Sequence, residues 1–506
     1  MAHGADETLA PWGLPGDGEA RPPLAADLRT EVCIVGAGVA GLSVAYRLAR
    51  HGRRVVVLEA GAVGSGESGR STAHLSSAVD DGWGALERLF GPEATRQVAA
   101  SHAAAVDFIE RTVAEEGIDC GFARLDAYLF NPPGGGLPLP AECAAAVRAG
   151  LAAELVGRAP LDAVDTGPAV RFADQGRLDP LAYARGLARA LVRLGGQLFT
   201  GTPVAEVASG RPARVTTVRG WHVLAEAVVV ATNVPVNDRL VIHGKQAPMR
   251  TYVVAGPADM AGAADALYWD TADPYHYARF QPRPDGPPIL IVGGEDHRTG
   301  HPADGNAKWN RLEAWARERF PGFGPVRWRW SGQVMEPADR LHFIGRNPVD
   351  EEGVFVATGD SGDGITGGTL AGLVIADLIE GRDNPWPRLY DPARLTLKAA
   401  SGYADTNLHV AEHYADWLTA GDVDDVARIA PGSGAVIRSG LSKQAVYRDE
   451  SGVLHRLSAV CPHLKCIVAW NEAEHSWDCA CHGSRFDRWG RVVNGPANQP
   501  LPPADG

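Results

Sequence analysis

The pattern of hydrophobic and polar positions predicts a βαβ unit near the start of the chain. Residues 1–30 are rich in Pro, Gly and Ala and show no period, so we interpret them as a lead-in segment. From Glu31 an apolar run, EVCIVGAG, predicts a strand that ends in a glycine turn. A stretch with helical spacing, VAGLSVAYRLARHG, and a second apolar strand, RRVVVLEAG, follow it.

The pattern of helices and strands continues to about residue 395. The Ala- and Glu-rich stretch 85–118 predicts helix, and β-branched runs at 195–207, 220–233 and 353–359 predict strands. The last helix, TLAGLVIADLIEG, ends with Gly381 as its C-terminal stop. We therefore expect an α/β domain over residues 31–395.

The composition changes at NPWP (384–387). A polar helical stretch and an acidic bridge, GDVDDV, predict a linker helix over residues 396–427. Short strands separated by Gly and Asp turns then predict a small all-β domain over residues 428–506. The predicted fold class is thus α/β followed by all-β.

Length, charge and the N-terminal segment bear on the number of domains, the kind of partner and the location of the protein. With 506 residues the chain is expected to form two or three domains. Its net charge of -13 argues against nucleic-acid and anionic-membrane partners; the acidic surface suits a basic electron-transfer partner or serves solubility alone. No apolar run approaches the roughly 20 residues that span a bilayer. The N-terminus lacks the basic and apolar regions of a secretory signal, so we expect a cytoplasmic protein.

Three glycines at the first turn indicate a dinucleotide-binding site. Gly36, Gly38 and Gly41 form G-x-G-x-x-G between the first predicted strand and the helix. In this motif the backbone approaches a pyrophosphate, which the helix N-terminus attracts. Glu59 ends the second strand, where a carboxylate accepts a hydrogen bond from a ribose hydroxyl.

Four further segments carry a family resemblance that implies FAD as the dinucleotide. GSGESGRSTAHLSS (64–77), GRLDPLAYARGLARALVRLGG (176–196), VVVATNVP (228–235) and ATGDSGDGITGG (357–368) together resemble the D-amino-acid oxidase family, in its glycine oxidase and sarcosine oxidase-like branch. The resemblance covers about residues 31–395. It implies a Rossmann-like FAD-binding part (about 31–85, 170–245 and 336–395) and an interleaved antiparallel-sheet substrate part (about 86–169 and 246–335). It also implies oxidation of a carbon–nitrogen bond.

The resemblance also implies which side chains surround FAD. Beyond the fingerprint residues, it places the following at the cofactor: Arg70, Ser71, Thr72, His74, Val204, Ala231, Gly359, Gly362, Gly364, Ile365 and Thr366. A helix beginning near Gly367 would direct its partial positive charge at the flavin. The string STAH resembles the Ser-Thr-Trp-His stretch of dimethylglycine and sarcosine dehydrogenases, whose histidine carries FAD covalently. Ala73 replaces the Trp, so we favour a non-covalent contact at His74 and leave the covalent bond open.

Four of the seven cysteines lie within residues 461–481, which indicates a site rather than a secreted disulfide framework. Cys461 and His463 form C-x-H, and Cys479 and His482 form C-x-x-H. Two such loops are what a Rieske [2Fe-2S] cluster needs, with the thiolates on one iron and the imidazoles on the other. Zinc is the competing metal for this ligand set.

The segments AVCPHLKCIVAWN, WDCACHGSRFD and GPA resemble the Rieske family over residues 428–506. The resemblance implies the [2Fe-2S] cluster in place of zinc, and a disulfide between Cys466 and Cys481. Ser484 matches a serine that donates a hydrogen bond to a cluster sulfide. Phe486 stands where a tyrosine is expected, and the loss of that donor should lower the reduction potential.

Three other patterns suggest chemistry that the two resemblances do not need. His409 and His413 belong to an H-x-x-E-H string, which we interpret as part of a linker helix rather than a zinc site. His297 and His301 raise the question of a mononuclear iron, but the flavoprotein resemblance explains their segment as sheet and turn. Oxidases of the sarcosine oxidase branch place a lysine near the flavin, and a loose alignment puts Ile291 there.

The combination predicts a flavoprotein that converts two-electron chemistry into one-electron transfer. We expect an FAD-dependent dehydrogenase that oxidises a small amine or amino acid and passes electrons through the cluster to an external one-electron acceptor protein. One alternative has electrons entering through the Rieske domain so that the flavin transforms a biosynthetic metabolite; another is an electron-transfer module or redox sensor without turnover. A second nucleotide fingerprint is not found, which disfavours NAD(P)H. The sequence identifies no catalytic base. Candidate pocket walls are Tyr252, Tyr275, Tyr277 and Trp330.

Overall fold

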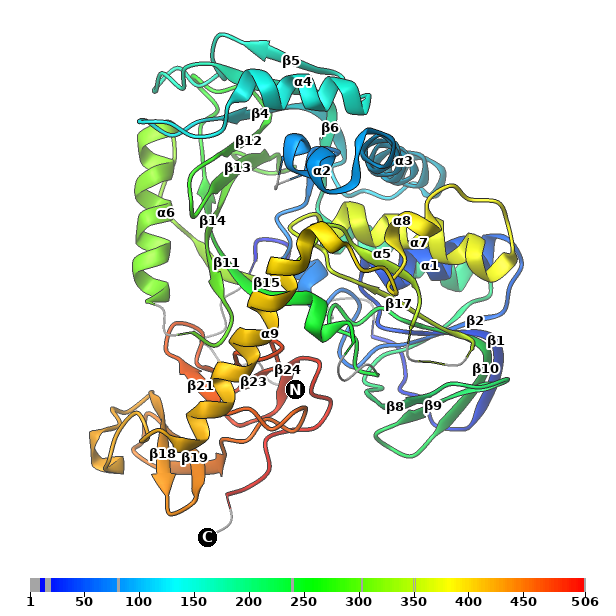
Figure 1. Ribbon diagram of the computed structural model, residues 1–506, viewed down its shortest axis with the longest axis vertical. Helices are drawn as coiled ribbons and strands as arrows, with labels where there is room; N and C mark the ends of the chain where they lie inside the picture. The colour runs from blue at the N-terminus through cyan, green and yellow to red at the C-terminus, as the bar shows by residue number, and fades with distance from the viewer. Residues whose placement is uncertain are drawn as a thin grey trace.

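The computed structural model describes residues 10–13, 20–79, 82–237, 241–301, 304–348, 350 and 352–504. Figure 1 shows two large sheets, a layer of helices above the first of them, and a small β domain at the C-terminal end of the chain. This confirms the predicted class, an α/β domain with an interleaved, mostly antiparallel sheet and a following all-β domain.

The first sheet is the core of the α/β domain, with the strand order β16-β17-β10-β1-β2-β7 and with β9 attached to β10 and β8 to β9. Its pairs from β17 to β7 are parallel, and the pairs made by β16, β9 and β8 are antiparallel. Val32 and Ile34 of β1 face one hydrophobic cluster, and Cys33 and Val35 face another on the opposite side. Strands buried on both faces read as continuous apolar runs, which is why the sequence predicted them. Its strands are β1 Leu28–Val35, β2 Val55–Leu58, β7 Gln197–Phe199, β8 Val204–Ala208, β9 Ala213–Thr217, β10 His222–Val230, β16 Phe343–Arg346 and β17 Val354–Thr358.

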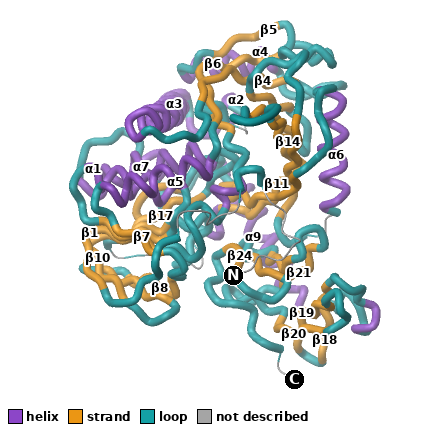
Figure 2. Tube along the Cα trace, turned by 180° about the vertical axis from the view of Figure 1, so that it is seen from behind, coloured by secondary structure: helices purple, strands orange, loops and turns teal. Residues whose placement is uncertain are grey.

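Helices α1, α5 and α7 lie side by side over one face of this sheet, as both ribbon views show (Figures 1 and 2). Helix α7 is buried on all sides from Ile365 to Asp377. A Cβ atom at Gly372 would lie 2.7 Å from Cβ of Ser43, so α1 and α7 approach this closely only because the residue is glycine. The helices of the α/β domain are α1 Val39–Arg50, α2 Trp83–Phe90, α3 Pro92–Glu116, α4 Leu139–Ala149, α5 Pro180–Arg193, α6 Gly305–Arg319, α7 Gly364–Glu380 and α8 Pro387–Tyr390, with the 3₁₀ turns η1 Glu67–Arg70 and η2 His243–Lys245.

The second sheet has the strand order β15-β11-β14-β13-β12-β4-β6-β3, with β5 beside β6. Trp309 and Leu312 of α6 pack on Val254 and Val292, so this helix covers the outer face of the sheet (Figure 1). Its strands are β3 His74–Leu75, β4 Ala123–Phe130, β5 Ala153–Val156, β6 Ala169–Arg177, β11 Gln246–Pro257, β12 Leu267–Asp270, β13 His276–Gln281, β14 Ile289–Arg298 and β15 Trp328–Pro337.

Three segments pack differently from what the expected internal boundaries imply. Strand β6 pairs with β4 and β5, so residues 170–177 belong to the second sheet and not to the FAD-binding part expected from residue 170. Strand β3, within the expected FAD-binding segment 31–85, also pairs with β6. Helix α3, expected in the substrate part, shares the hydrophobic cluster of α1 and α7. The chain passes between the two sheets inside these segments. The hydrophobic pattern does not mark such crossing points, so they could not be predicted from the sequence.

The linker and the all-β domain follow in the expected order. Helix α9 (Ala400–Tyr414) runs diagonally from the α/β domain to the β domain (Figure 1), flanked by the 3₁₀ turns η3 Leu397–Ala399, η4 Ala415–Leu418 and η5 Val426–Arg428. Two antiparallel sheets form the β domain: β18 Gly434–Ser439, β19 Ser442–Arg448 and β20 Leu454–Ser458, then β21 Val468–Asn471, β22 Ser476–Cys479, β23 Arg485–Asp487 and β24 Val492–Asn494. In the described part of the chain, no helix has the length and apolar character needed to cross a membrane.

Candidate functional site

A cavity of about 1250 Å³ opens between the two large sheets at the carboxyl ends of β1 and β2. Ligands of α/β proteins bind at this edge of the parallel sheet. Most of the residues predicted to surround FAD form its wall: Gly36, Gly38, Glu59, Arg70, Ser71, Thr72, His74, Val204, Ala231, Gly362, Gly364 and Ile365. Gly41, Gly359 and Thr366 are not on the wall.

The glycine turn after β1 has the shape that a pyrophosphate site requires. Gly36 has φ +107, and a Cβ atom there would collide with the carbonyl oxygen of Ala231. A Cβ at Gly41 would collide with the carbonyl oxygen of Gly36, so this residue packs α1 onto the strand and has no place on the wall. Gly38, at the N-terminus of α1, lies on the cavity wall, and the amide of Val39 donates to Oγ of Ser68 there at 3.0 Å. A helix N-terminus at a cavity wall is suited to binding phosphate.

Glu59 lies at the end of β2 and fits a ribose. Its two carboxylate oxygens accept hydrogen bonds from the amides of Ala37 and Gly61, both at 2.7 Å. Burial raises the pKa of Glu59, and these amide hydrogen bonds oppose that rise. Nearby, Oδ1 of Asn233 is buried on the cavity wall without a hydrogen-bond partner among the described residues, which fits a polar ligand in the cavity. The residues present thus fit FAD.

Helix α7 begins at Gly364, three residues before the start that we expected near Gly367. The amide of Gly367 donates to the carbonyl of Asp363 at 2.7 Å, which closes a helical turn earlier in the glycine-rich segment. Gly364 and Ile365 line the cavity, so the positive end of the helix faces it as expected. Thr366, in the same turn, is fully buried behind the wall.

His74 lies on the wall in an aromatic environment. Its Nδ1 is 3.2 Å from the hydroxyl of Thr72, and its ring meets Tyr277 edge-on with centroids 5.1 Å apart. Burial first, and then the charge of Arg279, lowers the pKa of His74 to about 3, so the ring is neutral at pH 7. A neutral ring suits the non-covalent contact that we expected, and the covalent bond to FAD stays an open prediction.

The four aromatic residues proposed as pocket walls fall into two groups, one on the cavity wall and one in the packed interior. Tyr275 and Tyr277 line the cavity, and the Tyr277 hydroxyl is 3.2 Å from that of Thr251. Tyr252 instead packs against Trp309, with centroids 5.6 Å apart. Trp330 donates from its indole nitrogen to the carbonyl of Arg70 at 2.8 Å. These last two residues belong to the packed interior.

Ile291 does not lie at the cavity, so it does not occupy the position at which the oxidases place a lysine. Its side chain is fully buried in an apolar cluster with Val253 and Trp330, and it is not on the cavity wall. The loose alignment placed it at the flavin, but strand β14 directs it toward the apolar cluster. An acidic side chain that the sequence analysis missed does reach the cavity: burial raises the pKa of Asp360 to about 7.

The four predicted cluster ligands lie on two matching turns of the β domain. In the first turn the amide of Cys461 donates to Cys466 O at 2.9 Å, and in the second the amide of Cys479 donates to Ser484 O at 2.8 Å. The rings of His463 and His482 are perpendicular, with centroids 5.0 Å apart. Both cysteines are buried and outside any disulfide. This donor set and its paired layout fit a Rieske cluster, for which the four residues stay the predicted ligands.

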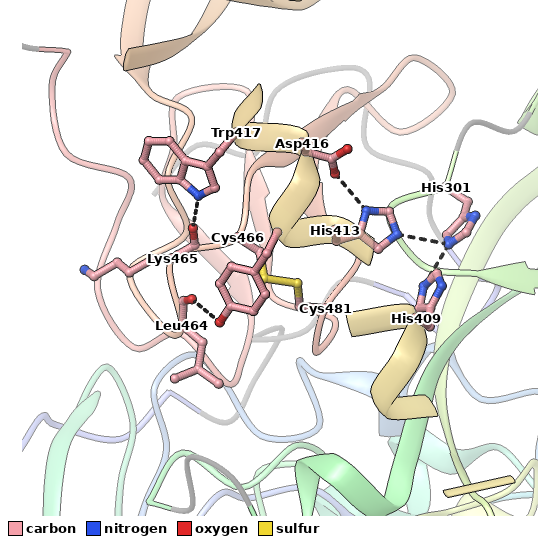
Figure 3. The surroundings of a disulfide bond; sticks show 10 residues. His301, His409, His413, Asp416, Trp417, Leu464, Lys465, Cys466 and Cys481 are labelled. Atoms are coloured by element: carbon pink, nitrogen blue, oxygen red, sulfur yellow. Dashed lines mark hydrogen bonds and ion pairs between the residues drawn. A yellow bond between two sulfur atoms is a disulfide. The ribbon is translucent and has the colours of Figure 1, made fainter. Parts of the chain in front are cut away.

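The disulfide between Cys466 and Cys481 is present and joins the two turns (Figure 3). Both residues are almost fully buried, in the same hydrophobic cluster as Phe486. The two loops therefore shield the disulfide from solvent. Burial, together with His243 and His463, lowers the pKa of His482 to about 2, and a neutral imidazole is the form that binds metal.

The histidine edge of the cluster site is docked on the FAD-binding domain. His243 of η2 is buried and meets His463 and His482 edge-on, with ring centroids 4.9 and 5.2 Å away. A Cβ atom at Gly483 would lie 2.6 Å from Nε2 of Gln333, which itself lines the cavity. The cluster site and the flavin cavity are thus close neighbours within one chain.

The β domain also contributes directly to the cavity wall. The side chain of Asn494 donates to Glu67 at 2.9 Å, and that of Asn498 donates to the carbonyl of Ala205 at 2.6 Å. The wall residues from this domain are Glu450, Asp487, Arg488, Trp489, Arg491, Val492, Val493, Asn494, Gly495, Ala497, Asn498 and Pro500. The sequence carries no signal for these contacts or for His243, because they join segments that are far apart along the chain.

Comparisons with known proteins agree with this arrangement. Residues 31–378 match the family model DAO, described as FAD dependent oxidoreductase, and residues 416–504 match the Rieske [2Fe-2S] domain. The protein YhfW of Bacillus subtilis (strain 168), whose name describes a Rieske 2Fe-2S iron-sulfur protein, is 28% identical over 508 residues, which is 100% of this chain and 99% of the relative. Gamma-glutamylputrescine oxidoreductase of Escherichia coli (strain K12) is 26% identical over 373 residues, 69% of this chain and 84% of the relative.

Among solved structures, the crystal structure of glycine oxidase from Geobacillus kaustophilus matches with a TM-score of 0.60 and 21% identity, covering 73% of this chain and 99% of that one. At this identity the match shows the fold. The family models show the two cofactors: the first domain binds FAD and the second binds a [2Fe-2S] cluster. The chain is therefore an enzyme of the FAD dependent oxidoreductase family that carries a Rieske [2Fe-2S] domain at its C-terminal end.

Proposed function

We propose that this enzyme oxidises a carbon–nitrogen bond of a small amine or amino acid and passes the electrons singly through the Rieske cluster to an external acceptor protein. The observation that carries the proposal is the docking of His463 and His482 on His243 beside the flavin cavity. A buried contact of this kind gives electrons a short path between the two cofactor sites of one chain. FAD supplies two-electron chemistry when bound, and the cluster supplies one-electron chemistry.

The substrate class is supported by the similar proteins and by the cavity. Two of them are named for gamma-glutamylputrescine and for glycine, and both compounds contain amine nitrogen. On the cavity wall, Tyr275, Tyr277 and Trp269 offer aromatic surface, and Thr251 offers a hydroxyl. Aromatic walls with a few polar groups are typical of small-molecule sites. We therefore assign the space beside these residues to the substrate.

Two features of the chain hold and tune the cofactor in this proposal. Glu59 and the N-terminus of α1 would hold the ribose and pyrophosphate ends of FAD, and Val204 would contact the adenine end. The N-terminus of α7 faces the flavin end, where a partial positive charge stabilises the negative charge that develops on reduction. The chain's net charge of -13 supports a basic protein as the external acceptor.

The experiment is anaerobic absorbance spectroscopy of the purified full chain during addition of amines, amino acids, NADH and NADPH, each in turn. We expect an amine or amino acid to bleach the flavin, after which the cluster becomes reduced. Replacing His243 by Leu should leave bleaching unchanged and slow the reduction of the cluster. The control variant His222→Leu changes a histidine near Thr216, away from the cluster loops, and should behave as wild type.

Two outcomes would contradict the proposal. If only NADH or NADPH reduces the protein, the electrons do not come from an amine, and the flavin acts on a different kind of substrate. If flavin bleaching by an amine is never followed by reduction of the cluster, the docked histidines are not an electron path.

A further inference from the structure

Three histidines from distant parts of the chain meet where the linker helix α9 crosses the end of β14 (Figure 3). Nε2 of His301 lies 2.9 Å from Nε2 of His409 and 3.4 Å from Nε2 of His413. His409 and His413 are four residues apart, so they share one face of the helix. The three ring nitrogens lie within 4.8 Å of one another.

Hydrogen bonding alone does not account for this arrangement. Each Nε2 atom has one in-plane position, which holds either a proton or a lone pair. A hydrogen bond can therefore join His301 to one of its neighbours but not to both.

A metal ion satisfies all three nitrogens together. A tetrahedral zinc ion binds imidazole at about 2.0–2.1 Å, which places two ligand nitrogens about 3.3 Å apart. The distances of 2.9 and 3.4 Å are close to that spacing. Imidazole is a good ligand for zinc, copper, iron and nickel, and it is a poor one for magnesium and calcium.

Asp416 adds an independent sign of a metal site. Its carboxylate oxygen lies 2.8 Å from Nδ1 of His413. A carboxylate in this position holds the proton on Nδ1 and leaves the lone pair on Nε2, as in carboxylate–histidine–metal triads. Glu412, the acid of the H-x-x-E-H string, is exposed, so the string does not reproduce the arrangement of a protease.

We propose that His301, His409 and His413 bind one divalent first-row transition metal ion, with zinc as the probe, and that this ion fastens α9 to the second sheet. The site is distinct from the Rieske cluster and does not depend on the substrate assigned above. Two side chains just beyond it, Tyr414 and Trp417, donate to the carbonyl oxygens of Leu464 and Lys465 at 2.8 and 2.9 Å. The ion thus stabilises the helix that holds the first cluster loop in place.

The test is zinc binding to the full chain carrying FAD and the cluster, measured by equilibrium dialysis and by elemental analysis. We expect one zinc ion per chain in addition to the cluster iron, and zinc X-ray absorption that shows imidazole nitrogens at about 2.0 Å. The double variant His409→Ala and His413→Ala should bind zinc at least 100-fold more weakly. Asp416→Asn should weaken binding by about 10–100-fold, because it removes the carboxylate that orients His413.

The control variant is His51→Ala. It removes a histidine that pairs with Glu380 at 2.8 Å and does not belong to the three-histidine site. It should bind zinc as wild type does. The absorbance of the flavin and of the iron–sulfur cluster reports whether each variant is folded. If the double variant loses either absorbance, the zinc affinity of Asp416→Asn, a change at a half-exposed residue, tests the proposal instead. Absence of stoichiometric zinc in the wild type would overturn the proposal, as would equal zinc affinity in the wild type and in a folded variant.

Discussion

Among single residues, Ser484 is placed to set the reduction potential of the cluster. Its hydroxyl oxygen accepts a hydrogen bond from the amide of Ala497 at 3.0 Å. The pKa of Cys461 is lowered to about 7 against the effect of burial, first by the hydrogen bond with Cys479, then by the amide of His463 and by the Ser484 hydroxyl. The hydroxyl therefore donates toward a sulfur of the cluster site, as the Rieske resemblance implied.

We predict that Ser484→Ala lowers the midpoint potential of the cluster. Loss of a hydrogen bond worth about 1 kcal/mol in favour of the reduced state shifts a one-electron couple by on the order of 40 mV. A redox titration followed by electron paramagnetic resonance measures the shift. Ser458→Ala is the control, because the hydroxyl of Ser458 accepts from the amide of Val460 in the same domain, at 3.3 Å. An unchanged potential in Ser484→Ala would contradict the assignment.

At the scale of elements, the disulfide joins the two turns that carry the predicted cluster ligands. Cys466 and Cys481 are separated by 15 residues, and both are buried. Closing a loop of about 15 residues stabilises a fold by about 3 kcal/mol in the chain-entropy model. The double variant Cys466→Ala and Cys481→Ala should therefore lose its cluster at lower urea concentration, which the visible absorbance of the cluster reports. Cys143→Ala, a buried free thiol of α4, is the control, and equal midpoints would refute the prediction.

The elements that could be predicted from the sequence are those whose signals are local. The β1–α1–β2 unit follows from continuous apolar strands around a glycine turn, and the Rieske loops follow from short Cys–His spacings. The start of α7 was predicted three residues late, because glycine-rich segments carry little helical pattern. The contact of His243 with the cluster loops, the meeting of His301 with His409, and the wall residues after Asp487 could not be predicted. Their roles come from contacts between segments that lie over 100 residues apart, and no local pattern records such contacts.

At the scale of the whole molecule, a buried ion pair joins the two redox domains. Arg250 of β11 and Glu474 of the Rieske domain are 2.5 Å apart, with side chains 0% and 4% exposed. Arg485 contacts the same carboxylate at 3.0 Å. Burial opposes ionisation of Glu474, but the charges of Arg250, Arg485 and Arg70 outweigh it and lower the pKa of Glu474 to about 2. Burial also lowers the pKa of Arg250, although an arginine stays protonated throughout the acid range.

The lowered pKa makes the docked state sensitive to acid. A carboxyl with a pKa near 4.5 in the unfolded chain and about 2 in the folded chain stabilises the fold fully above pH 4.5, and this contribution is lost as pH falls toward 2. The contribution at pH 7 is about 3 kcal/mol. We predict that Glu474→Gln destabilises the protein by this order at pH 7, and that the difference from wild type shrinks below pH 4.5. Urea unfolding at several pH values measures it. Glu93→Gln, in an exposed pair with Arg96, should change little at any pH, and a pH-independent deficit in Glu474→Gln would contradict the prediction.

The same docking predicts that electrons move within one chain and not between chains. His463 and the buried His482 face the buried His243 of their own chain, and a second molecule cannot take their place without undocking the Rieske domain. A Gly41→Val variant should lose FAD, because its side chain would collide with the Gly36 carbonyl, and a His482→Ala variant should lose the cluster. We predict that a mixture of the two shows no substrate-dependent reduction of a one-electron acceptor that wild type reduces through its cluster. The rate per wild-type chain should also be independent of protein concentration. Recovery of activity in the mixture, increasing with concentration, would show that the docked contact is not the route and that electrons pass between molecules.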